Sequence, residues 1–436
     1  MTNKFYTFCL AILMVCISNY TMAQNNNTSS PFSAFGFGEL SNKSTGRSNA
    51  MGGTAIGMRF RDQINPANPA SYTARDSMSM VFEMGASGKQ TRFASNGAVN
   101  NTNDSNFDYI ALSFRIQNGI ALAFGLQPYT NRGYSMSSTL KAGTTEEATV
   151  LYSGDGSVSK FFFGTGVKLF KNLSLGINAN YYFGTLTTNS SSDFKQTLSS
   201  DIYFNNTNRI RGLGVDAGLQ YQLDLDPEGK GPYMVFGATA KFNTKLKRDY
   251  DILRYYSNHN ITSGGSVTST NDTIQNMTGS SKDVNLPLGL GLGASYNVPN
   301  KLTLSADFYM EDWSDYNDNV GYATKDVTYG NRYIAAAGVE WIPEKFALRN
   351  YLKRISYRAG VRMEQDYIKI NGNNINTYAV TAGIGLPIAR QRSTLNIGVE
   401  FGTKGSSTST TFKQDYTKLY ISFALHDYWF FKRKID

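Results

Sequence analysis

Residues 47–72 read RSNAMGGTAIGMRFRDQINPANPASY, a segment in which closely spaced glycines precede a doubled Asn-Pro-Ala. Glycine allows one backbone to approach another closely, and each proline removes a donor and keeps the preceding residue out of the helical region. The segment is therefore predicted to be compact and rich in turns. From there almost to its end the chain alternates apolar and polar residues. We predict that residues 47–72 form a plug and that the following residues form a wall around it.

The first 23 residues have the features of an export signal. Lys4 supplies a basic start, residues 8–17 are apolar, and Thr21-Met22-Ala23 resembles a small-residue cleavage site. The apolar run is too short to span a bilayer. We therefore expect three parts, which are a signal peptide at 1–23, an N-terminal tail and plug at 24–77, and a barrel at 78–436.

Both cysteines, Cys9 and Cys16, lie within the apolar run of this signal. A lipid-modified cysteine would require a small residue before it, whereas Val15 precedes Cys16, which disfavours a lipoprotein signal. The mature chain is therefore expected to contain no cysteine, and hence no disulfide and no thiolate site.

Composition favours a membrane barrel over other classes of protein. Charged residues make up 17% of the chain, below the usual quarter, and Tyr (28), Phe (27) and Gly (41) are abundant. The net charge of +9 forms no block along the chain, which argues against a nucleic-acid partner. No stretch after the signal has the ~18 apolar residues of a membrane helix. These properties, with the long alternation, indicate a closed transmembrane β-barrel.

The alternation divides the chain into fourteen runs, most of them about ten residues or longer, as in the strands of such barrels. In residues 107–116, for example, Ile110, Leu112 and Phe114 share one face. A soluble half-buried sheet has the same period of two, so the prediction depends on the length and number of the runs. The predicted strands span residues 78–92, 106–116, 119–128, 157–171, 173–187, 209–223, 232–247, 283–296, 301–314, 330–342, 353–367, 375–387, 392–404 and 416–431.

The connections between these runs alternate in length, as in outer-membrane barrels with short periplasmic turns and long external loops. Short connections are predicted at 117–118, 172, 224–231, 297–300, 343–352 and 388–391. Long polar loops are predicted at 93–105, 129–156, 188–208, 248–282, 315–329, 368–374 and 405–415. Aromatic residues near strand ends are expected to form interfacial girdles, and they are Tyr182, Phe183, Tyr296, Trp313, Tyr333, Trp341, Tyr378 and Trp429.

The segment Asn49-Ala50-Met51-Gly52-Gly53, the Asn-Pro-Ala that closes it, the fourteen strands and the aromatic-rich final strand together resemble the FadL family of outer-membrane transport proteins, in its Bacteroidota-like branch. The resemblance implies an all-β fold, a fourteen-stranded antiparallel barrel with an N-terminal hatch in its lumen. It also implies that hydrophobic molecules are captured outside and leave sideways through the wall. The residues that carry this plug signature are Met51, Gly52, Gly53, Asn65, Pro66, Ala67, Asn68, Pro69 and Ala70.

Two functions compete at this stage. The first is passive uptake of small hydrophobic molecules, although the polar loops at 129–156 and 248–282 disfavour a long-chain fatty acid. The second is a non-transporting barrel subunit or shuttle of an outer-membrane assembly or secretion machine, because a relative of the family shuttles substrates of the type IX secretion system. The expected partners are outer-membrane lipid, a hydrophobic ligand or outer-membrane proteins. Candidate ligand-lining residues, which plain plug-to-wall packing explains equally well, are Phe32, Phe35, Phe37, Met58, Phe60, Phe162 and Tyr309.

A lateral opening requires a strand whose hydrogen-bond ladder is interrupted. Gly125 and Pro128 are the favoured site, because in the family the gap lies early in the barrel at an inward kink beside the hatch. The alternative is residues 284–294, where Pro287 is followed by a row of glycines that would also simply make space for the plug.

No arrangement of residues predicts catalysis. His259 is expected in a long loop, and His426 has no serine or acid obviously paired with it. Residues 224–229 carry carboxylates but lack the twelve-residue spacing of a calcium loop, so an ordinary polar turn is favoured. We predict that the chain is not an enzyme and holds no metal or cofactor.

Charged residues on the inward faces are expected to pair with the plug residues Arg59, Arg61 and Asp62, or alternatively to guide a substrate. These inward residues are Arg115, Lys168, Asp216, Lys241, Asp307, Glu340, Arg358, Arg362, Glu364 and Glu400.

Overall fold

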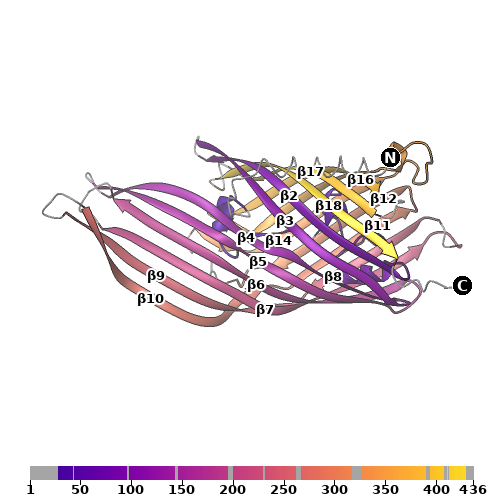
Figure 1. Cartoon of the computed structure of the whole chain (residues 1–436), viewed down its shortest axis with the longest axis horizontal. Coiled ribbons are helices and arrows are strands. Elements are labelled where there is room, and N and C mark those ends of the chain that lie inside the picture. Colours follow the sequence, from indigo (N-terminus) through magenta and orange to yellow (C-terminus); the bar gives the residue numbers. More distant parts are fainter. Residues whose placement is uncertain are drawn as a thin grey trace, which may run out of the picture.

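The computed structural model describes residues 28–428 apart from 43, 96–97, 143–145, 195–199, 229–230, 262–266, 317–325, 389–392, 407–409 and 411. Fourteen antiparallel wall strands form a closed barrel in which the last strand pairs with the first (Figure 1). This confirms the predicted fold class. The predicted signal peptide and Trp429 lie outside the described residues.

The wall follows the sequence order around the barrel, and three of its strands are interrupted. β8 and β9 form one wall strand, because β7 pairs with both of them. β10 and β11 form the next wall strand, because β10 pairs with β9 and β11 pairs with β8. β13 and β14 form a third, because both pair with β15. The bounds are β2 (Ser79–Ser95), β3 (Ala98–Gln117), β4 (Ile120–Ala142), β5 (Glu146–Lys168), β6 (Leu173–Phe194), β7 (Asp201–Asp224), β8 (Tyr233–Lys241), β9 (Thr244–Ile261), β10 (Val267–Leu286), β11 (Gly289–Val298), β12 (Leu302–Asp312), β13 (Val327–Tyr329), β14 (Asn331–Trp341), β15 (Ser356–Ile370), β16 (Asn373–Ile388), β17 (Ser393–Gly405) and β18 (Lys413–Tyr428).

The outer surface of the barrel carries the apolar faces of the alternating strands. Leu213 is 73% exposed and Leu292 is 66% exposed, and Phe161 and Phe401 also point outward. Large apolar side chains in such numbers on an outer face require lipid rather than water as their surroundings. Among the described residues, no helix is long and apolar enough to cross a membrane.

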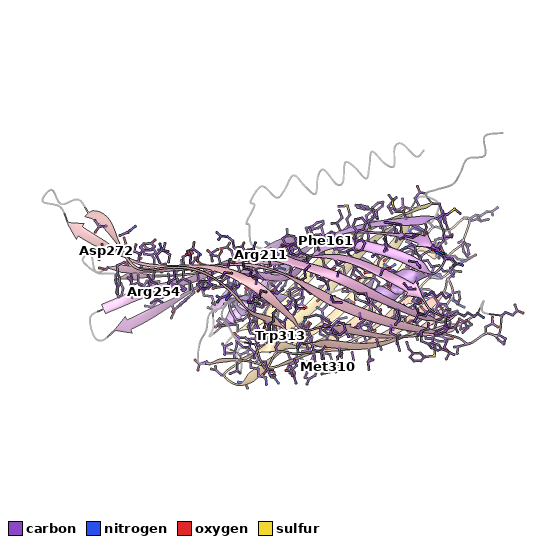
Figure 2. The ribbon with its side chains drawn as sticks, turned by 90° about the horizontal axis from the view of Figure 1, so that it is seen from below. Phe161, Arg211, Arg254, Asp272, Met310 and Trp313 are labelled. Carbon is purple, nitrogen blue, oxygen red and sulfur yellow. The ribbon has the colours of Figure 1, made fainter. Side chains whose placement is uncertain are left out.

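Strands β4 to β7, β9 and β10 continue beyond the barrel as a projecting sheet (Figure 1, left). The prediction of loops at 129–156, 188–208 and 248–282 is therefore wrong, since most of these residues lie in strands, and the same is true of 93–105 and 368–374. Outside the membrane neither face of a sheet has to be apolar, so Ser, Thr and Asn occupy strands here without the apolar alternation that reveals them. Figure 2 shows Arg254 and Asp272 on this projection, away from the barrel.

Residues 28–77 lie inside the barrel and contain only short elements, as predicted for a plug. These are η1 (Pro31–Ala34), β1 (Glu39–Leu40), α2 (Gly46–Asn49) and η2 (Pro69–Ala74). η2 is capped by Asn68, whose side chain accepts the N–H of Ala70 at 3.2 Å. Asn65 donates to the carbonyls of Ala55 and Met58 at 2.6 and 3.1 Å. The two asparagines of the doubled Asn-Pro-Ala therefore hold the plug's own turns together.

Glycines allow the plug backbone to lie directly against the wall backbone. Gly52 and Gly53 have φ values of 71° and 89°, in the region that favours glycine, and the N–H of Gly52 donates to Thr381 Oγ1 at 2.8 Å. A Cβ on Gly360 of β15 would collide with the backbone of Met51 and Gly52. The wall glycines therefore provide the space that the plug fills.

We expect Gly360→Leu to displace the plug or to prevent assembly, because an inserted side chain would occupy the position of the plug backbone. Overpacking of this kind costs about 3 kcal/mol. The temperature at which the folded band disappears in heat-modifiability electrophoresis should fall. Gly88→Leu is the matched control, since Gly88 is an exposed strand glycine whose Cβ would have no neighbour closer than 4.0 Å. Equal melting of the two variants would contradict close plug-to-wall packing.

Candidate functional site

The wall separates between β3 and β4. Their ladder begins at the pair Gln117–Ile120, next to the turn, and ends at the pair Ile110–Leu126. The part of β3 before Ile110 pairs only with β2. β4 continues along β5, with a register shift between Pro128 and Thr130. The ladder ends close to Gly125 and Pro128, the residues at which a lateral opening is predicted.

The glycine row that was the alternative kink keeps its ladder. Gly289, Gly291 and Gly293 pair with β8 on one side and β12 on the other, and the interruption is confined to residues 287–288. A Cβ on Gly293 would approach Gly57 of the plug at 2.7 Å. These glycines therefore make room for the plug.

The unpaired edge of β4 is taken by the N-terminal arm, residues 28–42 of the plug. β1 pairs antiparallel with β4, with Leu40 opposite Thr130. The N–H of Ser41 donates to the carbonyl of Tyr129 at 2.9 Å, and Thr130 Oγ1 donates to the carbonyl of Phe37 at 2.7 Å. The arm therefore replaces β3 as the partner of β4 for a few residues.

Directly inside the separation, aromatic side chains from arm and wall close the lumen. Phe37 is fully buried, its ring centroid 6.0 Å from that of Tyr129. The Tyr367 hydroxyl accepts the N–H of Phe37 at 3.0 Å and donates to the carbonyl of Gly38 at 2.8 Å. We call this group the aromatic cluster; it comprises Phe32, Phe37, Tyr129, Tyr182, Trp313, Tyr316 and Tyr367.

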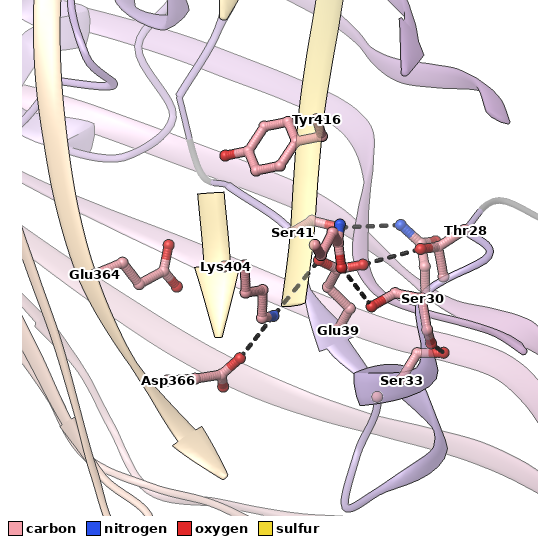
Figure 3. Close-up of polar contacts among 12 residues, drawn as sticks. Thr28, Ser30, Ser33, Glu39, Ser41, Glu364, Asp366, Lys404 and Tyr416 are labelled. Carbon is pink, nitrogen blue, oxygen red and sulfur yellow. Dashed lines mark hydrogen bonds and ion pairs between the residues drawn. The ribbon is translucent and has the colours of Figure 1, made fainter. Parts of the chain in front are cut away.

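Beside the aromatic cluster, ion pairs attach the arm to the wall (Figure 3). Glu39 lies 3.7 Å from Lys89 Nζ of β2 and 3.5 Å from Lys404 Nζ of β17, and it accepts a hydrogen bond from Thr28 at 2.9 Å. Lys404 also lies 2.8 Å from Asp366. Burial by itself would raise the pKa of Glu39, but the two lysines outweigh it and lower the pKa to about 2.

Two small cavities lie between the arm and the wall. One of about 160 Å³ reaches the wall at Pro128 and is lined by charged side chains, among them Glu39, Lys89 and Arg362. The other, of about 70 Å³, is lined by Tyr309, Lys241 and residues of the plug. An apolar cavity of about 150 Å³ accommodates benzene, so the larger space is of adequate size for one ring but has the wrong polarity. Neither of these two spaces fits an apolar ring, since the larger is lined by charged side chains and the smaller has only about 70 Å³.

The candidate ligand-lining residues do not meet at one place. Phe32 and Phe37 belong to the aromatic cluster and Phe35 packs against it. Met58 and Phe60 pack with Met51, whereas Phe162 packs with Ile64 and Tyr72. Tyr309 donates to Glu311 at 2.8 Å. Phe162 also lies opposite Gly125, at the end of the β3–β4 ladder, whereas the phenylalanines of the arm lie in or against the aromatic cluster.

Two residues of the aromatic cluster face the lumen, contrary to the prediction that they lie in an interfacial girdle. Tyr182 and Trp313 were predicted as interfacial aromatics, but both are 1% exposed and face the lumen. Phe183, Trp341 and Tyr378 are exposed on the outer face, as expected for a girdle. Successive residues of a strand point to opposite faces, and Tyr181 and Phe183 point outward. The sequence alternation therefore could have placed Tyr182 in the lumen.

Wall charges pair mainly with one another, and the plug partners differ from those predicted. Within the wall, Arg358 pairs with Glu340 at 2.6 Å and Lys241 with Glu311 at 2.8 Å. From the plug, Arg47 pairs with Glu340, which was not anticipated. The predicted plug partners behave otherwise: Arg59 donates to the uncharged wall residues Ser174 and Gln220, Arg61 lies 3.7 Å from Asp76, and Asp62 lies 3.6 Å from Arg47.

The other predicted polar positions lie away from this site. His259 lies in β9 rather than in a loop. His426 is buried, with its ring centroid 5.5 Å from that of Tyr428. Asp226 accepts the N–H of Glu228 at 3.3 Å, as in an ordinary polar turn. Within the ranges that the structure describes, no three His, Cys, Asp or Glu residues are grouped to hold a metal ion.

Glu39→Gln should loosen the arm at pH 7, because it removes the charge shared by Lys89 and Lys404. In the unchanged protein, the ionised carboxylate of Glu39 contributes its full stability above about pH 4.5, the pKa of this group in the unfolded chain. This stability is lost as the pH falls from there towards 2, the pKa in the folded protein. Amide exchange at residues 37–41 should therefore be slow at pH 7 and pH 5 and rise at least tenfold in the variant. Asp249→Asn, which removes an exposed ion pair with Arg211, is the control. Unchanged exchange in Glu39→Gln would contradict an electrostatic attachment of the arm.

Several solved structures share this fold. The Pseudomonas putida toluene transporter TodX matches with a TM-score of 0.58 and 16% identity, over 89% of this chain and 99% of that one. The Ralstonia pickettii toluene transporter TbuX (0.56, 16%, 90% and 98%) and a Pseudomonas aeruginosa FadL homologue (0.54, 11%, 90% and 100%) are similar to a comparable degree. These names describe transporters and a FadL homologue.

Two further comparisons concern the sequence. A search of curated proteins finds no match. A family model described as BamG matches residues 1–436. The predicted FadL-like architecture and outer-membrane location hold, and the protein belongs to the BamG family.

Proposed function

We propose that the protein is an outer-membrane channel for small hydrophobic molecules, closed at rest by its own N-terminal arm. The observation that carries the proposal is that Phe37 of the arm is fully buried in the aromatic cluster, with its ring centroid 6.0 Å from that of Tyr129, beside the β3–β4 separation. An apolar ring entering from outside would take the place of Phe37. The separation would then give it a sideways exit past Pro128 into lipid.

The energetics favour an exchange of this kind. A ligand ring replaces the Phe37 ring, so a similar apolar area is buried before and after the exchange. The remaining cost is that of the arm's hydrogen bonds to β4, each worth about 1 kcal/mol, and of the ion pairs of Glu39 with Lys89 and Lys404. A small apolar ligand competes with the arm where its own burial outweighs these contacts. The relatives described as toluene transporters support this chemical class.

The proposed division of the chain follows from the same argument. Residues 1–23 would be removed on export, residues 24–77 would form the tail and plug, and residues 78–436 the barrel. The arm would then be the mobile part of the plug, with the glycine-packed residues from Gly46 onward as its fixed part.

A second candidate function is that of a non-transporting subunit of an outer-membrane assembly. The projecting sheet favours it, because uptake requires no such structure. It exposes Ile274 and Met277, which are 47% and 45% exposed, and stacks Tyr203 on Tyr255 with ring centroids 5.0 Å apart. Apolar and aromatic side chains on a rigid projection are suited to contact with another protein.

A disulfide between arm and wall tests the uptake proposal. Leu40→Cys with Thr130→Cys joins residues that face each other between β1 and β4, and the mature chain is expected to supply no competing thiol. We expect the oxidised protein to lose uptake of a small aromatic probe such as toluene into proteoliposomes, and reduction to restore it. The control pair Gln90→Cys with Thr417→Cys bridges β2 and β18, which are already paired. Uptake through the oxidised arm lock would overturn the proposed gate.

Shortening the projecting sheet tests the second candidate. Deleting residues 254–275 and joining Leu253 to Asn276, which face each other, through an Asn-Gly turn should leave the barrel intact. If the protein is a subunit, other outer-membrane proteins should co-purify with the unmodified chain in stoichiometric amounts from native membranes. They should be lost from preparations of the deletion variant. The arm lock should leave them bound. A solitary barrel in every preparation, with uptake intact after the deletion, would exclude this function.

A further inference from the structure

The connection between β14 and β15, residues 342–355, exposes apolar side chains where the wall has already ended. Leu348 is 98% exposed, Phe346 65% and Leu352 63%. The alternation of the wall strands puts this connection at the periplasmic end, on the same side as the β3–β4 turn. Water does not favour such a surface, so a partner that covers it is required.

The segment is folded rather than extended. The N–H of Glu344 donates to the carbonyl of Lys353 at 2.8 Å, and η3 (Leu352–Arg354) forms a short turn. The Arg354 guanidinium lies 4.9 Å from the ring centroid of Tyr351. We call residues 342–355 the foot.

Two hydroxyl groups fix the foot to the lipid-facing side of the wall. Tyr357 stands on the outer face of β15, its ring centroid 5.9 Å from that of the exposed Trp341, and its hydroxyl donates to the carbonyl of Leu352 at 3.2 Å. The Tyr351 hydroxyl donates to the carbonyl of Pro387 on β16 at 3.1 Å. The foot is thus bent outward along the wall and away from the lumen.

The charges of the foot match an anionic surface. It carries four basic residues, Lys345, Arg349, Lys353 and Arg354, and a single acid, Glu344, which lies 3.2 Å from Lys353. Exposed Trp341 and Tyr357 are the residue types found at a membrane–water interface, and they lie on the two strands that the foot joins. Apolar side chains combined with Lys and Arg at that level are typical of segments that lie in the interface.

We propose that the foot lies in the inner leaflet of the outer membrane. Phe346, Leu348 and Leu352 insert among the acyl chains, and the basic residues bind the phosphate groups of anionic phospholipid. A phospholipid fits better than a protein, because the foot continues the lipid-facing surface of the wall. This inference is independent of uptake and of the projecting sheet, and it fixes the depth of the barrel on the side of β14 and β15.

The apolar contact is tested with the full-length mature barrel in proteoliposomes. Leu348→Cys, labelled with the environment-sensitive dye NBD, should emit at shorter wavelength than in water. Lipids with a doxyl group at acyl carbon 5 should quench it at least twofold. Glu228→Cys, at an exposed position in the turn at 225–228, is the control and should remain unquenched. Equal, water-like emission at both positions would overturn the proposal and leave the foot free for a protein partner.

The ionic contact is tested separately. Amide exchange at residues 345–354 should be at least threefold slower in vesicles of phosphatidylethanolamine and phosphatidylglycerol than in phosphatidylcholine. The triple variant Lys345→Gln, Arg349→Gln and Lys353→Gln should lose this difference and keep the quenching at Leu348. Heat-modifiability establishes that each variant is folded. Exchange that is insensitive to anionic lipid in the unmodified protein would overturn the phosphate contact.

Discussion

The hydrogen bonds that β4 loses on leaving β3 have to be made by another part of the chain. Backbone groups at this depth have little water to bind, and an unpaired strand edge there costs several kcal/mol. The N-terminal arm supplies the partner through β1 and through Ser41 and Phe37. The same contact that completes the wall therefore also brings Phe37 into the aromatic cluster.

The plug is attached in two physically different ways. From Gly46 onward its backbone lies against wall glycines such as Gly360, where there is no space for movement without separating two backbones. The arm is held by its backbone pairing with β4 and, in addition, by side chains, through Glu39 with its lysines and through Phe37 in the aromatic cluster. In the proposed function the arm is the part of the plug that would open.

The molecule meets two different solvents, and its surfaces differ accordingly. The barrel presents large apolar side chains to lipid, and the projecting sheet presents mainly Ser, Thr and Asn to water. The foot at 342–355 combines both types at the boundary. Uptake depends on the interior and membership of an assembly depends on the projection, so the two candidate functions use separate parts of the chain.

The sequence by itself determined the fourteen strands, the closed barrel and the plug, because a period of two is set by the two faces of a strand in lipid. The resemblance to the FadL family favoured a lateral opening near Gly125 and Pro128, and this stays a prediction. The sequence did not reveal the projecting sheet, since strands in water have no apolar alternation, and Ser and Thr there were taken for loops. Only the tertiary structure decided that Tyr182 and Trp313 face the lumen and that Phe32 and Phe37 meet them, because these contacts join residues from distant strands and depend on the register between them.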